Sequence, residues 1–276
     1  MNWKRGIDLG FTLFKERKVR RALLLVLSCL LPLALVRIWP HQPLSARVPL
    51  STAVWSADGE LLRVTLAADD QYRLWTPLSE MSPELIDAFL LKEDRFFRWH
   101  PGVNPVALVR ASFKTYNGGQ RQGGSTLTMQ LARRLYRLKT RSPAGKFRQI
   151  VAAFWLEARY SKREILEAYL NFAPFGGNIE GVGAASRIYF GKAPSRVNLG
   201  EALTLAVIPQ RPADRAGRTV QEGALLAARS QLGALWLDDR GAARMDASDP
   251  RQVELPIVAR SEFALPFEAP HFVNAI

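Results

Sequence analysis

Two carboxylate segments of the sequence could carry out acid–base chemistry. Glu93 and Asp94 end a predicted helix and are followed by aromatic residues and His100, whereas Glu167 lies in a second predicted helix. A carboxylate at a helix end beside aromatic residues can have a raised pKa and serve as a general base or acid. Taken locally, a surface acidic pair at Glu93 and Asp94 and a routine helix carboxylate at Glu167 explain the same residues.

A glycine-rich loop and a cationic run could bind an anion. Residues 123–126 (Gly-Gly-Ser-Thr) precede a predicted helix, and backbone N–H groups in such a loop can hold an anion. Residues 110–163 carry thirteen basic side chains and one acidic side chain, Glu157. Such a run is usually a solvated surface, but because no acidic residue lies between Arg110 and Glu157, anion binding is an equally good explanation.

Composition limits the classes of partner and site. The chain has 276 residues, a net charge of +13 and 48% hydrophobic residues, which is enough to form a buried core. Its single cysteine excludes an internal disulfide framework and a cysteine-rich zinc site, and its three scattered histidines do not favour a histidine-based metal site. The positive charge favours an anionic partner: a nucleic acid, a membrane surface or a phosphorylated substrate.

The N-terminal region has the pattern of a membrane anchor. Residues 1–21 carry seven basic and two acidic side chains and predict a cytoplasmic basic tail. Residues 22–39 carry no charge except Arg37 and predict a transmembrane helix of roughly 27 Å, because a helix rises ~1.5 Å per residue. Because basic residues precede the apolar run, the N-terminus is predicted to be cytoplasmic and the remainder of the chain to be exported. A cleaved signal peptide is the alternative, but no clean small-x-small cleavage site follows the apolar run.

The elements that must position the candidate residues are mainly helical. Residues 40–52 form a proline-rich connector, and residues 54–75 predict a β-hairpin near the membrane with a turn at Asp58-Gly59. A helix is predicted over 82–97, with Ser82 as its N-cap. Further helices are predicted over 127–138, 144–160, 162–172, 181–189, 199–208 and 221–236.

Taken together, these segments resemble the peptidoglycan glycosyltransferases of glycosyltransferase family 51. This is the glycosyltransferase domain of class A penicillin-binding proteins, and the resemblance is closest to their 1C branch. It covers about residues 50–240. Five blocks occur in the family's order: Glu93-Asp94-Arg95-x-Phe97-x-x-His100-x-Gly102, Gly123 to Leu131, Lys146 ahead of Glu157, Ile165 to Asn171, and a weaker block around Arg229. Five blocks in order are specific, although any one of them alone is not.

The resemblance implies a fold, an activity and a location. The implied fold is a mainly α, lysozyme-like glycosyltransferase domain over residues 53–240, with a small apolar subdomain that dips into the bilayer. Such enzymes polymerise lipid II into glycan strands in cell-wall biosynthesis, with inversion at C1 and release of polyprenyl pyrophosphate. The implied location is the inner (cytoplasmic) membrane, crossed once, with the catalytic domain on the periplasmic side. The implied partners are lipid II, the growing glycan strand, the membrane and other cell-wall synthesis proteins, and no nucleic acid.

The resemblance also implies roles for individual residues. Glu93 would be the general base that takes the proton of the acceptor's 4-hydroxyl, and Glu167 the second carboxylate, near the leaving pyrophosphate. No protein metal cage is expected, so an assisting Mg²⁺ or Mn²⁺ would be bound by the pyrophosphate. The residues expected to support the site are Asp94, Phe97, His100, Gly102 and Gly124. Those expected to bind substrate are Ser125, Thr126, Gln130, Lys139, Arg141, Lys146, Arg148, Asn171 and Arg229.

The sequence departs from the family in several places. Met129 and Arg134 stand where many members have Gln and Asn. The third block usually reads Arg-Lys-x-x-Glu, and here Gly145, Lys146 and Gln149 occupy those places, so only the Lys is kept. Because neither Ser-x-x-Lys nor Lys-Thr-Gly occurs, no transpeptidase activity is expected. Residues 241–276 are interpreted as the start of a linker to an absent C-terminal domain.

Three other functions stay open at this stage. A lysozyme-like lytic enzyme would cleave glycan strands, but it needs neither the membrane anchor nor the cationic segment. A membrane-tethered nucleic-acid-binding protein would use the cations, but the predicted export argues against it. A catalytically weak scaffold is the third, because the departures in the third block fall at the expected donor site.

Overall fold

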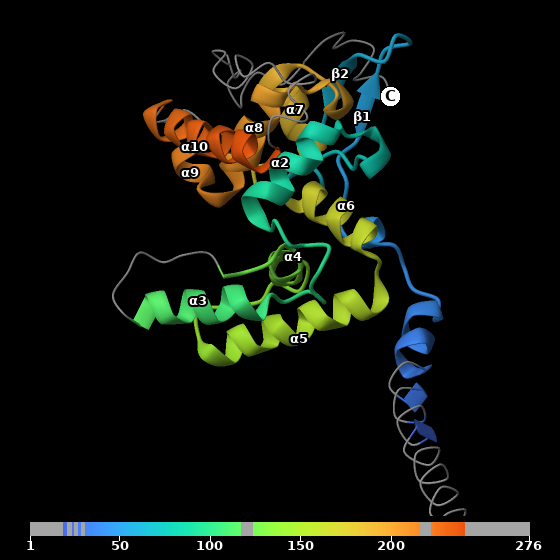
Figure 1. The fold of residues 1–276 in the computed structure, drawn as a ribbon. Coiled ribbons are helices and arrows are strands. Elements are labelled where there is room, and N and C mark those ends of the chain that lie inside the picture. The colour runs from blue at the N-terminus through green and yellow to red at the C-terminus, as the bar shows by residue number, and fades with distance from the viewer. Residues whose placement is uncertain are drawn as a thin grey trace, which may run out of the picture. The chain divides into compact units, whose positions relative to one another are not determined.

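The computed structural model of the chain describes residues 19–20, 24, 27–28, 31–116, 124–215 and 222–240, and its fold is drawn in Figure 1. Two compact units are present. One comprises Met1–His41 with Ala158–Tyr160, and the other comprises Gln42–Glu157 with Ser161–Ile276. All candidate site residues belong to the second unit.

The first unit contains the end of the predicted membrane segment. Residues 31–38 are helical, and the Arg37 guanidinium donates a hydrogen bond to the carbonyl oxygen of Tyr160 at 3.2 Å. Most of the predicted tail 1–21, part of the predicted span 22–39 and the predicted linker 241–276 lie outside the described residues. Within the described part of the chain, no helix combines the length and the apolar character needed to cross a membrane.

Helices make up most of the second unit, which confirms the prediction of a mainly α fold. They are α2 (Pro83–Glu93), α3 (Pro105–Tyr116), α4 (Leu127–Leu135), α5 (Pro143–Arg159), α6 (Lys162–Phe172), α7 (Val182–Phe190), α8 (Leu199–Val207), α9 (Pro212–Arg215) and α10 (Glu222–Arg240). Short 3-10 helices cover η1 (Leu44–Arg47), η2 (Leu78–Glu80), η3 (Pro194–Arg196) and η4 (Ile208–Gln210).

The β structure is shorter than the sequence predicted. β1 (Ala53–Trp55) pairs antiparallel with β2 (Leu61–Val64), so the hairpin and its Asp58-Gly59 turn are confirmed. The predicted extension of this hairpin to Trp75 is wrong. Instead β3 (Tyr72–Arg73) pairs parallel with β4 (Ile179–Glu180), because the buried Arg73 side chain forms an ion pair with Glu180. β-strand propensity alone does not determine whether residues 72–73 extend the hairpin or pair with β4.

The start of α2 is as predicted, but its end is not. Ser82 accepts a hydrogen bond from the Leu85 N–H at 3.2 Å, and Pro83 occupies the first helical position. The helix ends at Glu93 rather than at the predicted residue 97. The next residue, Asp94, leaves the helix because its carboxylate binds the ring of His100 and the backbone of α4.

Aromatic packing fixes α2 against α6. Phe89 of α2 is fully buried and packs edge-on against Tyr169 of α6 and against Phe175. α2 also packs against α8, a helix that is buried along its whole length. Because these contacts hold α2 from several sides, the position of its last residue, Glu93, is well defined.

α3 was not predicted, although the sequence contains its start signal. The Asn104 side chain accepts a hydrogen bond from the Ala107 N–H at 3.0 Å, and Pro105 is the first helical residue. Leu108 of α3 and Ile150 of α5 pack against a small buried cluster of Val103, Met129 and Ala153. α3, α4 and α5 therefore form one packed group, as Figure 1 shows.

Candidate active site

The carboxylate of Glu93 is buried, and one of its two oxygens is unpaired among the described residues. Its Oε2 accepts a hydrogen bond from the Gln130 side-chain amide at 2.7 Å. Its Oε1 is buried and accepts no hydrogen bond from any residue that the structure describes. Burial raises the pKa of Glu93, and the contacts with Gln130 and Lys92 oppose that rise. A carboxylate with a free lone pair and a raised pKa is suited to act as a general base.

The residues after α2 are tied to the start of α4. The Asp94 carboxylate lies 2.9 Å from Nε2 of His100 and accepts the Leu127 N–H at 3.0 Å. The Thr126 hydroxyl donates to the carbonyl of Gly102 at 2.5 Å and accepts the Met129 N–H. These bonds bring the first turn of α4 beside Glu93.

The hydroxyl of Thr126 makes its hydrogen bonds inside the protein. Its side chain is 3% exposed, and its hydroxyl is used as a donor and as an acceptor within the protein. In the structure this side chain caps α4, and the predicted contact of Thr126 with substrate stays a prediction. Gly102 has φ +86°, and a Cβ there would lie 2.7 Å from the Glu157 side chain, so a close approach requires glycine.

Phe97 and His100 both contact Lys162. The Phe97 side chain is 1% exposed, and the Lys162 ammonium lies 4.3 Å from the centre of its ring. Lys162 also donates to the His100 carbonyl at 2.6 Å and to Glu157 at 2.7 Å. The geometry gives both residues supporting contacts, and it gives Glu157 a place in the same network.

Lys146 is a cation held by neutral partners. Its ammonium donates to the Ser125 hydroxyl at 2.7 Å and to the Gln149 side-chain carbonyl at 3.0 Å. Gln149 in turn donates to the Met129 carbonyl at 2.7 Å. Burial lowers the pKa of Lys146, and the charge of Arg133 lowers it further. Since neither partner is charged, the lysine charge is left for an anion.

A cleft of about 900 Å³ lies at the end of α4 and is rich in cations. We call it the cationic cleft; it is lined by Arg133, Arg134, Arg137, Leu138, Lys139, Thr140, Arg141 and Ser142. The predicted substrate residues Lys139 and Arg141 are thus brought together, and Gly124 and Ser125 precede the same helix. Gln130, which binds Glu93, precedes Arg133 of this cleft by three residues. Gln130 and Arg133 are therefore about one turn apart along α4.

Arg148 is not brought into this group. It is exposed on α5, two residues after Lys146. Two residues rotate a helix by about 200°, so the two side chains leave α5 on nearly opposite faces. The substrate contact predicted for Arg148 stays a prediction, and in the structure this side chain lies apart from Lys146.

Glu167 and Asn171 fasten a neighbouring segment instead of opening to a substrate. The Glu167 carboxylate accepts the Trp75 indole N–H at 3.1 Å and the Leu78 N–H at 2.9 Å. The fully buried Asn171 amide bonds both the N–H and the carbonyl of Thr76 at 2.8 Å. Both side chains therefore hold the segment from Trp75 to Leu78, and the catalytic role predicted for Glu167 and the substrate contact predicted for Asn171 stay predictions.

Tyr169 shows which face of α6 meets Glu93. Burial raises the pKa of Tyr169 strongly, and the nearby charge of Glu93 adds to this rise. Glu167 precedes Tyr169 by two residues, so it leaves α6 about 200° away from that face. The sequence block that contains both residues does not reveal this difference.

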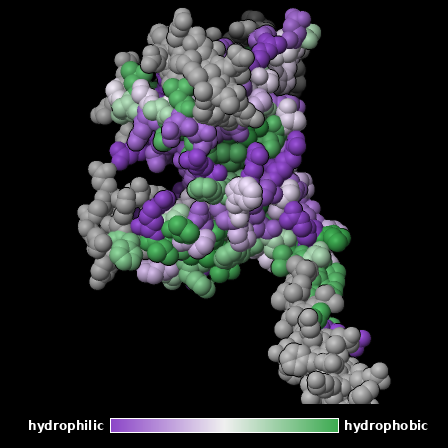
Figure 2. Space-filling view, viewed as in Figure 1, coloured by the Kyte–Doolittle hydropathy of each residue, from purple (hydrophilic) through white to green (hydrophobic). Residues whose placement is uncertain are grey.

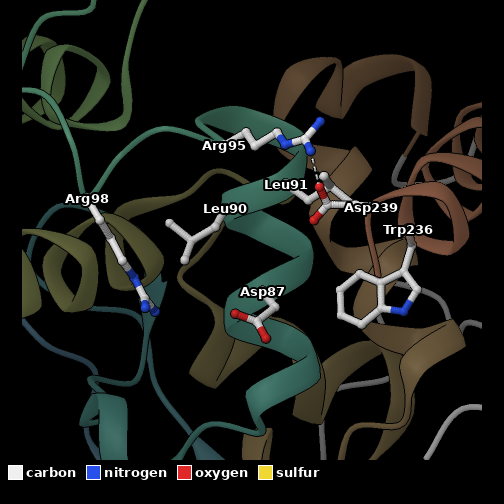
Figure 3. A pocket seen from close by; sticks show the side chains of 7 residues that line it. All are labelled: Asp87, Leu90, Leu91, Arg95, Arg98, Trp236 and Asp239. Carbon is white, nitrogen blue, oxygen red and sulfur yellow. Dashed lines mark ion pairs between the residues drawn. The ribbon is translucent and has the colours of Figure 1, made fainter. Parts of the chain in front are cut away.

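The last expected substrate residue, Arg229, lies on α10. Its side chain is 4% exposed, and burial lowers its pKa. Figure 3 shows a separate cleft between α2 and α10, where Arg95 forms an ion pair with Asp239 and the Trp236 ring forms one wall. Arg229 is not among the residues that line that cleft or the cationic cleft.

Sequence reasoning assigned no role to Arg215, which lies near Glu93, or to Arg133, which lies near Lys146 and in the cationic cleft. Arg215, at the end of α9, is close enough for its charge to lower the pKa of Glu93, and its guanidinium donates to the Val207 carbonyl at 2.6 Å. Arg133 was part of the noted cationic run but had no assigned role. Pro212 at the start of a short helix was the signal for α9, whereas nothing local connects α9 with α2.

A buried carboxylate bound by α4, together with a cationic cleft at the end of the same helix, defines a helical domain suited to transferring a group from an anionic donor. The chain belongs to the transglycosylase family, whose profile matches residues 58–232. Penicillin-binding protein 1C of Escherichia coli (strain K12) is 43% identical over 180 residues, which are 64% of this chain and 23% of that protein. Penicillin-binding protein 1A of the same strain is 32% identical over 218 residues, 79% of this chain and 23% of that protein.

One solved structure was also similar. The crystal structure of penicillin-binding protein 1A from Haemophilus influenzae aligns with 83% of this chain and 23% of that chain, with a TM-score of 0.42 and 20% identity. The chain thus spans about a quarter of the length of the relatives that it matches. The family match confirms the resemblance drawn from the sequence blocks, and with it the interpretation as a glycosyltransferase domain.

Proposed function

We propose that this chain is a peptidoglycan glycosyltransferase that polymerises lipid II into glycan strands, with inversion at C1 and release of polyprenyl pyrophosphate. The observation that carries the proposal is the buried, unpaired Oε1 of Glu93, on a carboxylate that is bound by Gln130 of α4, the helix whose end lines the cationic cleft. A base and a phosphate-binding cleft served by the same helix fit a sugar whose C1 carries a diphosphate. Family membership supports the same reading, and a lysozyme-like fold belongs to the proposal.

In the proposed reaction, Glu93 removes the proton from the acceptor's 4-hydroxyl. The hydroxyl oxygen forms a bond to C1 of the donor, and the bond from C1 to the diphosphate oxygen breaks with its electron pair. Lys146, Arg133 and Arg141 stabilise the charge that the leaving diphosphate gains, which is usually a large catalytic contribution. The proton stays on Glu93 until it is released to solvent.

This scheme uses one carboxylate. Glu167 is occupied by Trp75 and Leu78, and the third block has Gln149 where the family usually has Glu. Gln149 holds Lys146 without neutralising it, so the leaving group meets cations alone. Within the described residues no group of three or more acidic, histidine or cysteine side chains could hold a metal ion. That an assisting Mg²⁺ or Mn²⁺ would take its ligands from the substrate diphosphate remains part of the proposal.

An exposed apolar surface supports a membrane location. The exposed large hydrophobic residues of α3 are Val106, Val109 and Phe113, and those of α5 are Phe147, Val151, Phe154 and Trp155. Figure 2 shows apolar residues gathered over these two helices. We call this surface the α3–α5 face. A surface of this kind fits the outer leaflet of the inner (cytoplasmic) membrane, with residues 22–39 as a single-pass anchor and the domain on the periplasmic side.

The test is incubation of the purified full chain with lipid II, followed by separation of the products by length. Growth of glycan strands is expected. Shortening of preformed strands without growth would favour a lytic enzyme, and lipid II binding without either reaction would favour a scaffold. Association with other cell-wall synthesis proteins is a further expectation, which co-purification from membranes would check.

A further inference from the structure

Arg137 has a backbone conformation that arginine rarely adopts. It follows α4 with φ +49°, in the left-handed region. Its N–H donates to the Arg134 carbonyl at 3.1 Å, and the Leu138 N–H donates to the Arg133 carbonyl at 2.8 Å. These two bonds form a Schellman motif, in which glycine is the preferred residue at the left-handed position. An arginine there carries a steric cost that glycine avoids.

The Arg137 side chain lies where two clefts meet. One is the cationic cleft. The other has a volume of about 350 Å³ and is lined in part by Asp69, Arg73 and Glu180. Arg134 and Arg137 are the two residues that line both clefts. A ligand bound to Arg137 would therefore be accessible from both clefts.

The two shared arginines differ in their partners. Arg134 donates to the Glu180 carboxylate at 3.0 Å, and Arg73 forms ion pairs with Glu180 and with Asp69. The carboxylates of the second cleft are therefore already engaged. Arg137 is exposed, and among the described residues no carboxylate forms an ion pair with it. Its guanidinium is left for a ligand from outside the chain.

Helix stabilisation accounts for its neighbours but not for Arg137. Cations in the last turn of a helix interact favourably with the helix dipole, and Arg133 and Arg134 occupy that turn. The Schellman bonds already satisfy the last carbonyls, and glycine would make them at lower cost. What the arginine adds is its side chain at the junction of the clefts.

We propose that Arg137 forms a further anion subsite at this junction, and that its ligand is a phosphate group of a lipid-linked diphosphate. The identity of that ligand rests on the proposed function. Five cations around one cleft (Arg133, Arg134, Arg137, Lys139 and Arg141) repel one another, and an anion with several charges on adjacent groups relieves that repulsion. A guanidinium can bind two oxygens of one phosphate at once.

The test compares Arg137→Gly with Arg137→Ala in the full chain. Calorimetry with inorganic pyrophosphate at low salt is expected to give about tenfold weaker binding for both variants, because both lose the guanidinium. Melting temperatures separate the backbone effect: the glycine variant should match or exceed the unaltered chain, and should exceed the alanine variant. With lipid II, KM should rise by a similar factor while kcat stays within about twofold.

Arg163→Ala is the matched control, because it also removes one exposed cation, on α6, outside both clefts. Its pyrophosphate affinity should be unchanged. The subsite is overturned if Arg137→Gly binds pyrophosphate as tightly as the unaltered chain, if Arg163→Ala weakens binding equally, or if the unaltered chain does not bind pyrophosphate. Binding that depends on Arg137 without strand growth would support the subsite while contradicting the proposed function.

Discussion

At the scale of single residues, the proposed chemistry depends most on Glu93. Glu93→Gln keeps the size of the side chain and a contact with Gln130, but it cannot accept a proton. Polymerisation should fall by a factor of about 10²–10⁴, which is the usual contribution of a general base. Lipid II binding should be largely retained. Initial rates and binding on the same preparation check this, and an active variant would remove Glu93 from the proposed role.

The same residue predicts opposite pH effects on activity and stability. Burial raises the pKa of Glu93, so activity should decline as pH falls through that raised value, because the base becomes protonated. Folding favours the protonated form, so the favourable contribution of Glu93 to stability is present at low pH and is lost as pH rises through the raised pKa. Glu93→Gln should therefore melt higher than the unaltered chain at neutral pH. The difference should vanish below the ordinary carboxyl pKa of about 4.3.

Lys146 allows a separate test of leaving-group stabilisation. Its ammonium is held by Ser125 and Gln149 and has no charged partner in those contacts. Lys146→Ala should lower kcat at least a hundredfold, which corresponds to ~3 kcal/mol of transition-state stabilisation. Arg196→Ala, at an exposed position in η3, loses the same charge and should behave as the unaltered chain. Equal rates for both variants would assign leaving-group stabilisation to other cations.

At the scale of elements, α6 holds the segment between β3 and α2 through Glu167 and Asn171. Glu167→Ala leaves the Trp75 and Leu78 donors without their acceptor. The free energy of unfolding should fall by about 1–2 kcal/mol, because the two donors are partly buried and leaving them unpaired is costly. Urea denaturation measures this. At temperatures where the variant stays folded, its kcat should remain within about tenfold, whereas a catalytic carboxylate would lose far more.

The same helix shows what the sequence could and could not predict. The bounds of α6 were predicted correctly, because Ser161 and Glu164 form a capping box before an apolar period. The contacts of its residues could not be predicted in the same way, since a sequence block fixes the spacing along a helix but not which neighbour each face meets. Tyr169 faces Glu93, whereas Glu167 faces Trp75, and that difference depends on how α2 and β3 pack.

Long-range contacts explain the other errors. Arg73 belongs to a strand that pairs with residues more than a hundred positions later, which no local pattern encodes. α2 ends early because Asp94 bonds to the distant Leu127 N–H. Glu93, Gln130 and Lys146, by contrast, were singled out because they belong to the sequence blocks of the family, and the roles that the resemblance implies for them stay predictions.

At the scale of the whole molecule, the net charge of +13 separates into distinct parts. The cations of 1–21 belong to the predicted tail, and those of 133–141 converge on the cationic cleft. The α3–α5 face contributes exposed apolar groups from the helices that flank α4. The lipid-linked diphosphate of the proposed function would match both features, because it joins an anionic head to a membrane-embedded tail.

This combination predicts that the α3–α5 face matters only when the substrate is in a bilayer. Phe113 and Phe147 are 69% and 66% exposed, and inserting an aromatic side chain into lipid contributes ~1.5–3 kcal/mol when it is fully buried. The double variant Phe113→Ser, Phe147→Ser should polymerise lipid II in vesicles at least tenfold more slowly. In detergent micelles its rate should stay within about twofold, because no bilayer has to be entered.

The matched double variant Leu226→Ser, Leu235→Ser on α10 should lose activity in neither medium, since it removes similarly exposed apolar groups from another surface. Equal losses in vesicles for the two double variants would mean that the α3–α5 face does not dock on the membrane, and equal losses in vesicles and micelles would indicate damage to the fold.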